Sequence, residues 1–127
     1  MVKNFLVDTD VLIEHLKGNL TVSKFLEKLR DKGELCVSVL SQAEVYAGMR
    51  EEEREITEFL FDTLKSFDVS DEIAKVGGIY RRTYKDSHGT GLIDGMIGAT
   101  AKTYGLVLVT ANASHFPMPK LKLLSPK

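Results

Sequence analysis

The sequence contains one cysteine, no long apolar run and almost no net charge, and each shortage excludes a class of protein. A lone cysteine can form no internal disulfide, and Cys36 lies in an apolar run. We therefore expect it to be a small buried core residue in a reducing, cytoplasmic setting. No apolar stretch approaches the ~20 residues of a membrane-spanning helix, so we expect no association with membranes. The chain leads directly from Met1 into a strand, so we expect no signal peptide.

The charges are nearly balanced, with 17 Lys and Arg against 18 Asp and Glu and a net charge of −1. This balance argues against a protein that holds nucleic acid by bulk electrostatics. It leaves room for a nucleic-acid enzyme with a local basic rim around a metal-loaded acidic centre, because metal ions reverse the sign of such a site. The candidates for phosphate contacts are Arg50, Arg81, Arg82 and Lys85, whose alternative role is a solvated helix face.

Apolar periodicity divides the chain into alternating strands and helices. With 43% hydrophobic and 28% charged residues, residues 1–127 have the composition of a single globular domain. Strands are expected at 5–7, 35–39, 67–69, 106–109 and 121–124. Helices are expected at 11–17, 21–30, 41–49, about 51–64, 70–85 and 92–104. Thr21 is the expected cap of the second helix. The expected inner side of the fourth helix consists of Ile56, Phe59, Leu60 and Leu64. The alternation predicts an α/β fold with a parallel sheet.

The first strand ends at Asp8, which makes this residue the first candidate for a site. In open α/β sheets, ligands bind just beyond the carboxyl ends of the strands. The alternative is that Thr9 or Asp10 caps the following helix and that Asp8 belongs to an ordinary turn.

Glu44 and Asp94 are the second and third candidates. Glu44 lies on the first turn of the helix after the second strand, although Ser41 and Glu44 also have the spacing of a capping box. Asp94 lies in a helix with small or apolar residues on nearly every side, where a charge needs a partner or a metal. Its alternative role is a favourable position near the helix N-terminus.

The loop after the fourth strand supplies the remaining candidates, Thr110, Asn112 and His115. Their alternative role is a polar turn that folds Phe116 into the core. Clustered carboxylates repel one another unless they are protonated or bridged by a cation. Because oxygen ligands select magnesium or manganese rather than zinc, Asp8, Glu44 and Asp94 suggest metal-assisted hydrolysis of a phosphodiester.

At this point the sequence resembles a PIN-domain protein, and specifically the VapC-type toxin ribonucleases of toxin–antitoxin pairs. The resemblance covers essentially the whole chain, through four ordered motifs at Leu6–Ile13, Ser38–Gly48, Ile93–Ala101 and Leu108–Phe116. It makes Asp8 and Asp94 metal ligands and Glu44 the acidic residue of the second motif.

The resemblance implies a three-layer α/β/α sandwich around a mostly parallel five-stranded sheet. It also implies magnesium-dependent (or manganese-dependent) cleavage of RNA, a homodimer, and inhibition by a cognate antitoxin protein. The chain departs from the family at His115, where an aspartate is usual, and at Asp10, where asparagine is common. The first departure puts a second metal position in doubt.

Two other functions remain open from the sequence. One is a nuclease of the same fold that is not a toxin, and the other is a catalytically impaired module that binds nucleic acid or protein. Magnesium-dependent cleavage by the purified protein would exclude the second alternative.

Overall fold

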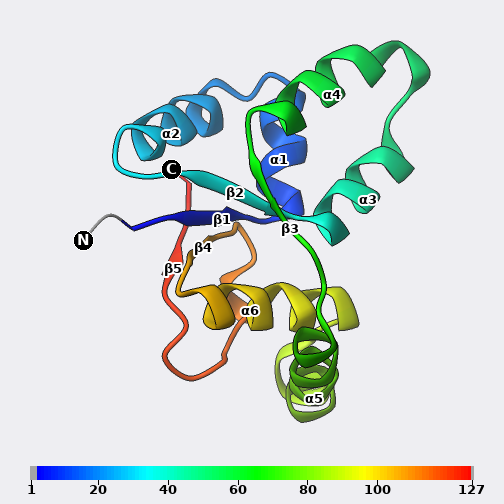
Figure 1. The fold of residues 1–127 in the computed structure, drawn as a ribbon, viewed down its shortest axis with the longest axis vertical. Helices are drawn as coiled ribbons and strands as arrows, with labels where there is room; N and C mark the ends of the chain where they lie inside the picture. The colour runs from blue at the N-terminus through cyan, green and yellow to red at the C-terminus, as the bar shows by residue number, and fades with distance from the viewer. Residues whose placement is uncertain (1–2, 127) are drawn as a thin grey trace.

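The computed structural model describes residues 3–126, in which a five-stranded sheet lies between two layers of helices (Figure 1). The strands are β1 (Phe5–Val7), β2 (Leu35–Ser38), β3 (Lys65–Phe67), β4 (Val107–Val109) and β5 (Leu123–Leu124). All pairs are parallel and the order is β3-β2-β1-β4-β5. Leu6 of β1 is in register with Cys36 on one side and Leu108 on the other.

Four helices cover one face of the sheet and two cover the other (Figure 1). The first layer holds α1 (Thr9–Leu16), α2 (Leu20–Arg30), α3 (Val39–Gly48) and α4 (Arg54–Asp62). The second holds α5 (Asp71–His88) and α6 (Leu92–Tyr104). Two single-turn 3-10 helices, η1 (Glu51–Glu53) and η2 (Ala113–His115), interrupt the connections. The predicted three-layer α/β/α sandwich is confirmed.

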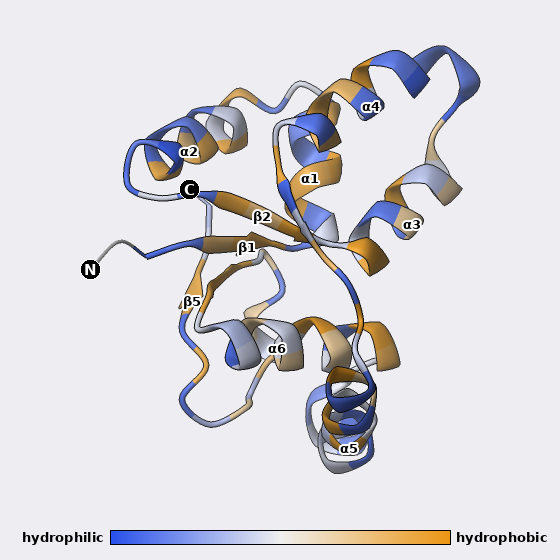
Figure 2. Cartoon of the chain, in the orientation of Figure 1, coloured by the Kyte–Doolittle hydropathy of each residue, from blue (hydrophilic) through white to orange (hydrophobic). Residues whose placement is uncertain are grey.

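The central strands separate two hydrophobic cores because successive side chains point to opposite faces. Phe5 and Val7 pack with the α1–α4 layer, whereas Leu6 packs with the α5–α6 layer. Figure 2 shows β1 and β2 as hydrophobic along their length, as expected of parallel strands covered on both sides. Cys36 is fully buried in the second core, where burial raises the pKa of its thiol to about 11.

Three helix starts differ from the expectation. Asp8 itself caps α1, Asn19 caps α2 in place of Thr21, and Ser38 caps α3. Each of these side chains accepts a hydrogen bond from a backbone N–H of the first turn. Because α3 begins at Val39, Ser41 lies inside that helix and the proposed capping box with Glu44 does not exist.

The buried side of α4 also differs from the expectation. Thr57, Leu60 and Phe61 are buried, whereas Ile56 and Phe59 are 59% and 70% exposed. Burial of Thr57 is possible because its hydroxyl donates to the carbonyl of Glu53 at 2.8 Å. The helix therefore presents an apolar surface outward. Within residues 3–126, no helix is both long and apolar enough to cross a membrane.

Helices α5 and α6 cross at a glycine contact. A Cβ on Gly95 would overlap the carbonyl oxygen of Gly77, and a Cβ on Gly77 would lie 2.7 Å from the Cα of Met96. Only a residue without a side chain permits such an approach. The crossing fixes the first turn of α6, which carries Asp94, against α5.

Candidate active site

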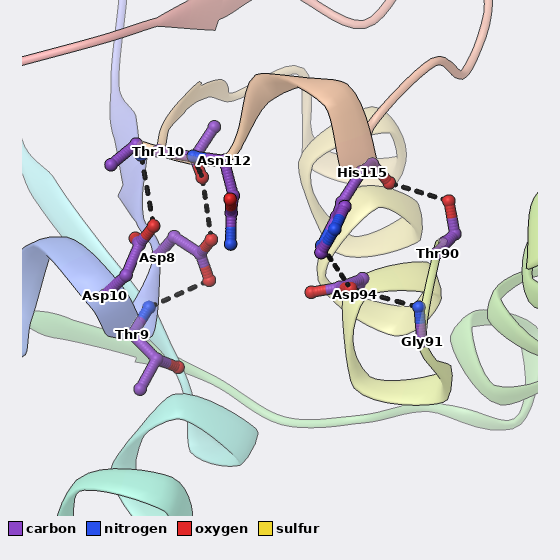
Figure 3. A network of polar contacts seen from close by, with 10 residues as sticks. Asp8, Thr9, Asp10, Thr90, Gly91, Asp94, Thr110, Asn112 and His115 are labelled. Carbon is purple, nitrogen blue, oxygen red and sulfur yellow. Dashed lines mark hydrogen bonds and ion pairs between the residues drawn. The ribbon is translucent and has the colours of Figure 1, made fainter. Parts of the chain in front are cut away.

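Asp8 lies at the carboxyl edge of the sheet, between the ends of β1 and β4. Its backbone N–H donates to the carbonyl of Val109 at 2.9 Å, which continues the parallel pairing past the end of β1. One carboxylate oxygen, Oδ1, accepts from the N–H of Thr9 at 2.8 Å, and Oδ2 accepts from the hydroxyl of Thr110 at 2.8 Å. Figure 3 shows this arrangement. The side chain is only 6% exposed, so the sheet edge holds a buried carboxylate.

The surroundings of Asp8 disfavour its negative charge. Burial is the largest cause, and the charges of Asp10 and Asp94 add to it, so that the pKa of Asp8 rises to about 7. The hydrogen bonds from Thr110 and Thr9 lower the pKa and offset part of this effect. A strongly raised carboxylate pKa from burial and like charges is typical of functional sites.

Asp10 lies beside Asp8 on the first turn of α1. Its Oδ2 accepts from the N–H of Ala111 at 3.2 Å, and burial followed by the charge of Asp94 raises the pKa of Asp10. Its Oδ1 is buried, and among the described residues it has no hydrogen-bond partner. Such an oxygen has unused capacity for a water or a cation.

Glu44 is exposed on α3 and is tied to α1 rather than to its own helix terminus. Its Oε1 accepts from the hydroxyl of Thr9 at 2.5 Å, and Thr9 directly follows Asp8. Ser41, one turn earlier, is 1% exposed, and its hydroxyl has no partner within the described part of the chain. Thr9 therefore connects Glu44 with Asp8, a role that the sequence analysis missed.

Asp94 lies on the first turn of α6, where a backbone N–H and an imidazole ring approach its carboxylate. Its Oδ2 accepts from the N–H of Gly91 at 3.0 Å, and Nδ1 of His115 lies 3.3 Å from the same oxygen (Figure 3). Asp94 thus has a histidine beside it and also accepts from the N-terminal backbone of its own helix, so both roles considered for it stay open. His115 thus contacts Asp94, while 35% of its side chain stays exposed.

The loop after β4 joins the two halves of the site. Thr110 is fully buried and bonds Asp8, while its hydroxyl also accepts from the N–H of Asn112 at 3.0 Å. The side chain of Asn112 makes no hydrogen bond within residues 3–126. Thr90 donates to the backbone carbonyl of His115 at 2.8 Å. Nothing in the sequence distinguished Thr90 from an ordinary loop residue.

The donor set fits a hard divalent cation. Asp8, Asp10 and Asp94 influence one another's charge, all offer oxygen atoms, and the free oxygen of Asp10 has no other partner among the described residues. Within residues 3–126, however, no three Asp, Glu, His or Cys side chains are close enough together to hold one ion. Glu44 in particular faces Thr9, so a complete ligand set requires its exposed side chain to turn.

The predicted phosphate contacts fall into two groups. Arg50 forms ion pairs with Glu52 and Glu53 at 3.4 and 3.5 Å. Arg81, Arg82 and Lys85 are exposed on α5 and form no ion pair within the described chain. The backbone N of Arg81 lies beside Gly95, the neighbour of Asp94. Helix α5 therefore packs against the turn that carries Asp94, and its exposed cations are free of ion pairs within the described residues.

A match to a known domain over most of the chain shows to which family the protein belongs. The family described as the PIN domain matches residues 5–118, which include Asp8, Glu44, Asp94 and His115. The chain belongs to the PIN-domain family. Its predicted membership and its fold are both confirmed.

Two relatives of this PIN domain come from Mycobacterium tuberculosis. Ribonuclease VapC10 is 41% identical over 114 residues, which cover 89% of this chain and 86% of the relative. Ribonuclease VapC19 is 36% identical over 115 residues, which cover 89% of this chain and 92% of the relative.

Solved structures with the same fold include chains of toxin–antitoxin complexes. A chain of the toxin–antitoxin complex from Klebsiella pneumoniae has a TM-score of 0.82 and 26% identity, over 96% of this PIN domain and 97% of that chain. A chain of the DNA-bound VapBC structure from Salmonella typhimurium has a TM-score of 0.79 and 23% identity, over 98% of both chains. At 23% identity, the likeness to the Salmonella typhimurium chain shows the fold alone.

Proposed function

We propose that this PIN domain is a metal-dependent endoribonuclease and the toxin of a toxin–antitoxin pair. The observation that carries the proposal is the buried carboxylate of Asp8, whose pKa is raised to about 7 beside Asp10 and Asp94 at the carboxyl edge of the sheet. The names of the relatives, Ribonuclease VapC10 and VapC19, support RNA as the substrate.

Asp8, Asp94 and Glu44 would hold the cation, Mg²⁺ or Mn²⁺, and Asp10 would contribute through its unpartnered oxygen. A bound cation supplies a nucleophilic water near neutral pH and neutralises charge that develops on the phosphodiester. Thr110 and the N–H of Thr9 fix the orientation of the Asp8 carboxylate, whereas Glu44, which the hydroxyl of Thr9 contacts, would turn toward the cation.

The exposed face of α5 would position the RNA. Arg81, Arg82 and Lys85 carry positive charge that no acidic side chain in the described residues neutralises. Phosphate contacts of this kind set register and affinity without reading sequence. Arg50 is less suited to this role because Glu52 and Glu53 already pair with it.

The antitoxin would bind a groove of about 350 Å³ between α1, α3 and α4. Its apolar lining comprises Ile13, Leu16, Val45, Met49 and Ile56, and its rim carries Lys17, Arg50 and Glu53. An apolar groove with a charged rim suits an amphipathic helix. Exposed Phe59 on α4 extends the apolar surface next to Ile56.

The nuclease proposal is tested with purified protein and a mixed RNA substrate. We expect cleavage with Mg²⁺ or Mn²⁺, none in EDTA, and none by Asp8→Asn, whereas Asp62→Asn at an exposed position of α4 should cleave normally. Undiminished cleavage by Asp8→Asn would contradict the assignment.

The toxin role requires separate tests. We expect a small antitoxin gene directly upstream, and sequencing of RNA ends after brief expression should reveal a defined set of cuts. Ile56→Lys should abolish binding of the antitoxin, whereas Leu20→Lys, at an exposed leucine of α2, should not. Equal binding by both variants would place the antitoxin elsewhere.

A further inference from the structure

His115 contacts Asp94 in a way that leaves one carboxylate oxygen held and the other open. Oδ2 of Asp94 is approached by Nδ1 of His115 at 3.3 Å and by the N–H of Gly91 at 3.0 Å. Figure 3 shows the other oxygen of Asp94 on the side that faces Asp8. This is the oxygen that remains for a cation.

The orientation of the imidazole argues against His115 as a ligand itself. A carboxylate oxygen only accepts hydrogen bonds, so the nitrogen that faces it favourably is the one that carries a proton. A metal ligand needs the unprotonated nitrogen. In a neutral ring that nitrogen is Nε2, which faces Gly89, since a Cβ on Gly89 would lie 3.6 Å from it. Nε2 therefore lies close to the turn at Gly89.

Contacts of the His115 backbone and of the next residue also restrain the position of the imidazole. The backbone carbonyl of His115 accepts from the hydroxyl of Thr90, which is 1% exposed, at 2.8 Å. The next residue, Phe116, is buried against α6 beside Gly98. His115 is thus anchored to the same helix that carries Asp94.

We propose that His115 is a positioning residue for Asp94, which fixes Oδ2 and leaves Oδ1 for a divalent cation shared with Asp8. This inference rests on the cation that the proposed function requires, but it does not depend on RNA cleavage. It assigns His115, which stands at the usual aspartate position, to a contact with Asp94 instead of ligation. Partners that orient a ligand in this way commonly contribute 10- to 100-fold to metal affinity.

The experiment measures Mn²⁺ binding by the whole chain in the absence of RNA. His115→Asn places an amide N–H close to the position of Nδ1, whereas His115→Gln places it close to the position of Nε2. We expect His115→Asn to bind Mn²⁺ as the unchanged protein does, and His115→Gln and His115→Ala to bind about 10-fold more weakly. His88→Asn, at an exposed histidine on α5, serves as the control and should have no effect.

The preference between Mg²⁺ and Mn²⁺ provides a second readout. An imidazole ligand favours Mn²⁺, so removal of a ligand would shift the ratio of the two affinities, whereas removal of a positioning contact would weaken both equally. Loss of Mn²⁺ binding in His115→Asn as large as in His115→Ala, or a shifted ratio, would overturn the proposal. Melting in EDTA establishes that the compared variants are folded. If the binding pattern holds but no RNA is cut, the ribonuclease proposal fails and the positioning role stands.

Discussion

The carboxylate of Asp8 caps α1 and at the same time lies where its charge is unfavourable. The folded pKa of about 7 exceeds the ordinary value of 3.8, so the folded protein binds an extra proton between these pH values. This proton contributes to the free energy of unfolding of the metal-free protein at acidic pH. The contribution is lost as the pH rises through about 7.

Asp8→Asn should therefore stabilise the metal-free protein at pH 8 by about 1–3 kcal/mol and have little effect at pH 4. The amide oxygen of the variant can still accept from the N–H of Thr9. Its NH₂ group can donate to the hydroxyl oxygen of Thr110, which then accepts instead of donating. Urea unfolding in EDTA at both pH values measures the difference, with Asp62→Asn as the control. A variant less stable than the unchanged protein at pH 8 would refute this prediction.

Glu44→Gln separates the charge of Glu44 from its hydrogen bond. A glutamine can still accept from the hydroxyl of Thr9, so the melting temperature in EDTA should not change. Cleavage should fall by at least about 10-fold, because a neutral amide is a poor partner for Mg²⁺. Normal cleavage would reduce Glu44 to a structural contact between α1 and α3.

At the scale of elements, the crossing of α5 and α6 offers a comparison between adjacent glycines. Gly77→Ala should destabilise the protein by about 1–3 kcal/mol, because its Cβ would meet the backbone of Met96. Gly78→Ala meets nothing within 4 Å and should be neutral or stabilising by up to about 1 kcal/mol. Thermal melting of both variants checks the pair, and equal effects would show that the crossing can relax.

The sequence was most informative where one physical signal dominated. The bounds of α6 were predicted as observed, since its apolar residues end at Gly105, which adopts a left-handed φ of 64°. Strand β3 was placed two residues too late, because at the edge of the sheet Lys65 and Ser66 are exposed and give no apolar run. On the inner side expected for α4, Leu60 and Leu64 are buried as predicted, but Ile56 and Phe59 are exposed, because periodicity alone did not separate two apolar sides.

The candidate site shows the same limit. Asp8 and the loop after β4 became candidates because polar residues that follow apolar strands are visible in the sequence, and Asp94 because it is a charge in an otherwise small and apolar helix. The contacts that organise them could not, since Thr9 with Glu44 and Thr90 with His115 join segments that only tertiary packing brings together. Local signals also suggested a capping box that the actual start of α3 excludes.

At the scale of the whole molecule, we expect a homodimer. The motivation is the family resemblance together with the exposed apolar side chains, which include Phe59, Leu92 and Tyr104. Light scattering should give twice the mass of the chain. Phe59→Lys should leave that mass unchanged if α4 faces the antitoxin, and a shift to monomer would assign α4 to the contact between copies.

The hydrogen bond between Thr110 and Asp8 joins residues 102 positions apart, and Ala111 and Asp10 are 101 apart. At a synthesis rate of about 5–20 residues per second, residues 110 and 111 follow the first aspartates by roughly 5–20 s. Until then β1 lacks its neighbour β4, and the carboxylates of Asp8 and Asp10 lack the donors that the loop after β4 supplies. The acidic centre therefore forms late in translation, so a nascent chain that already displays β1, β2 and their helices has no assembled active centre.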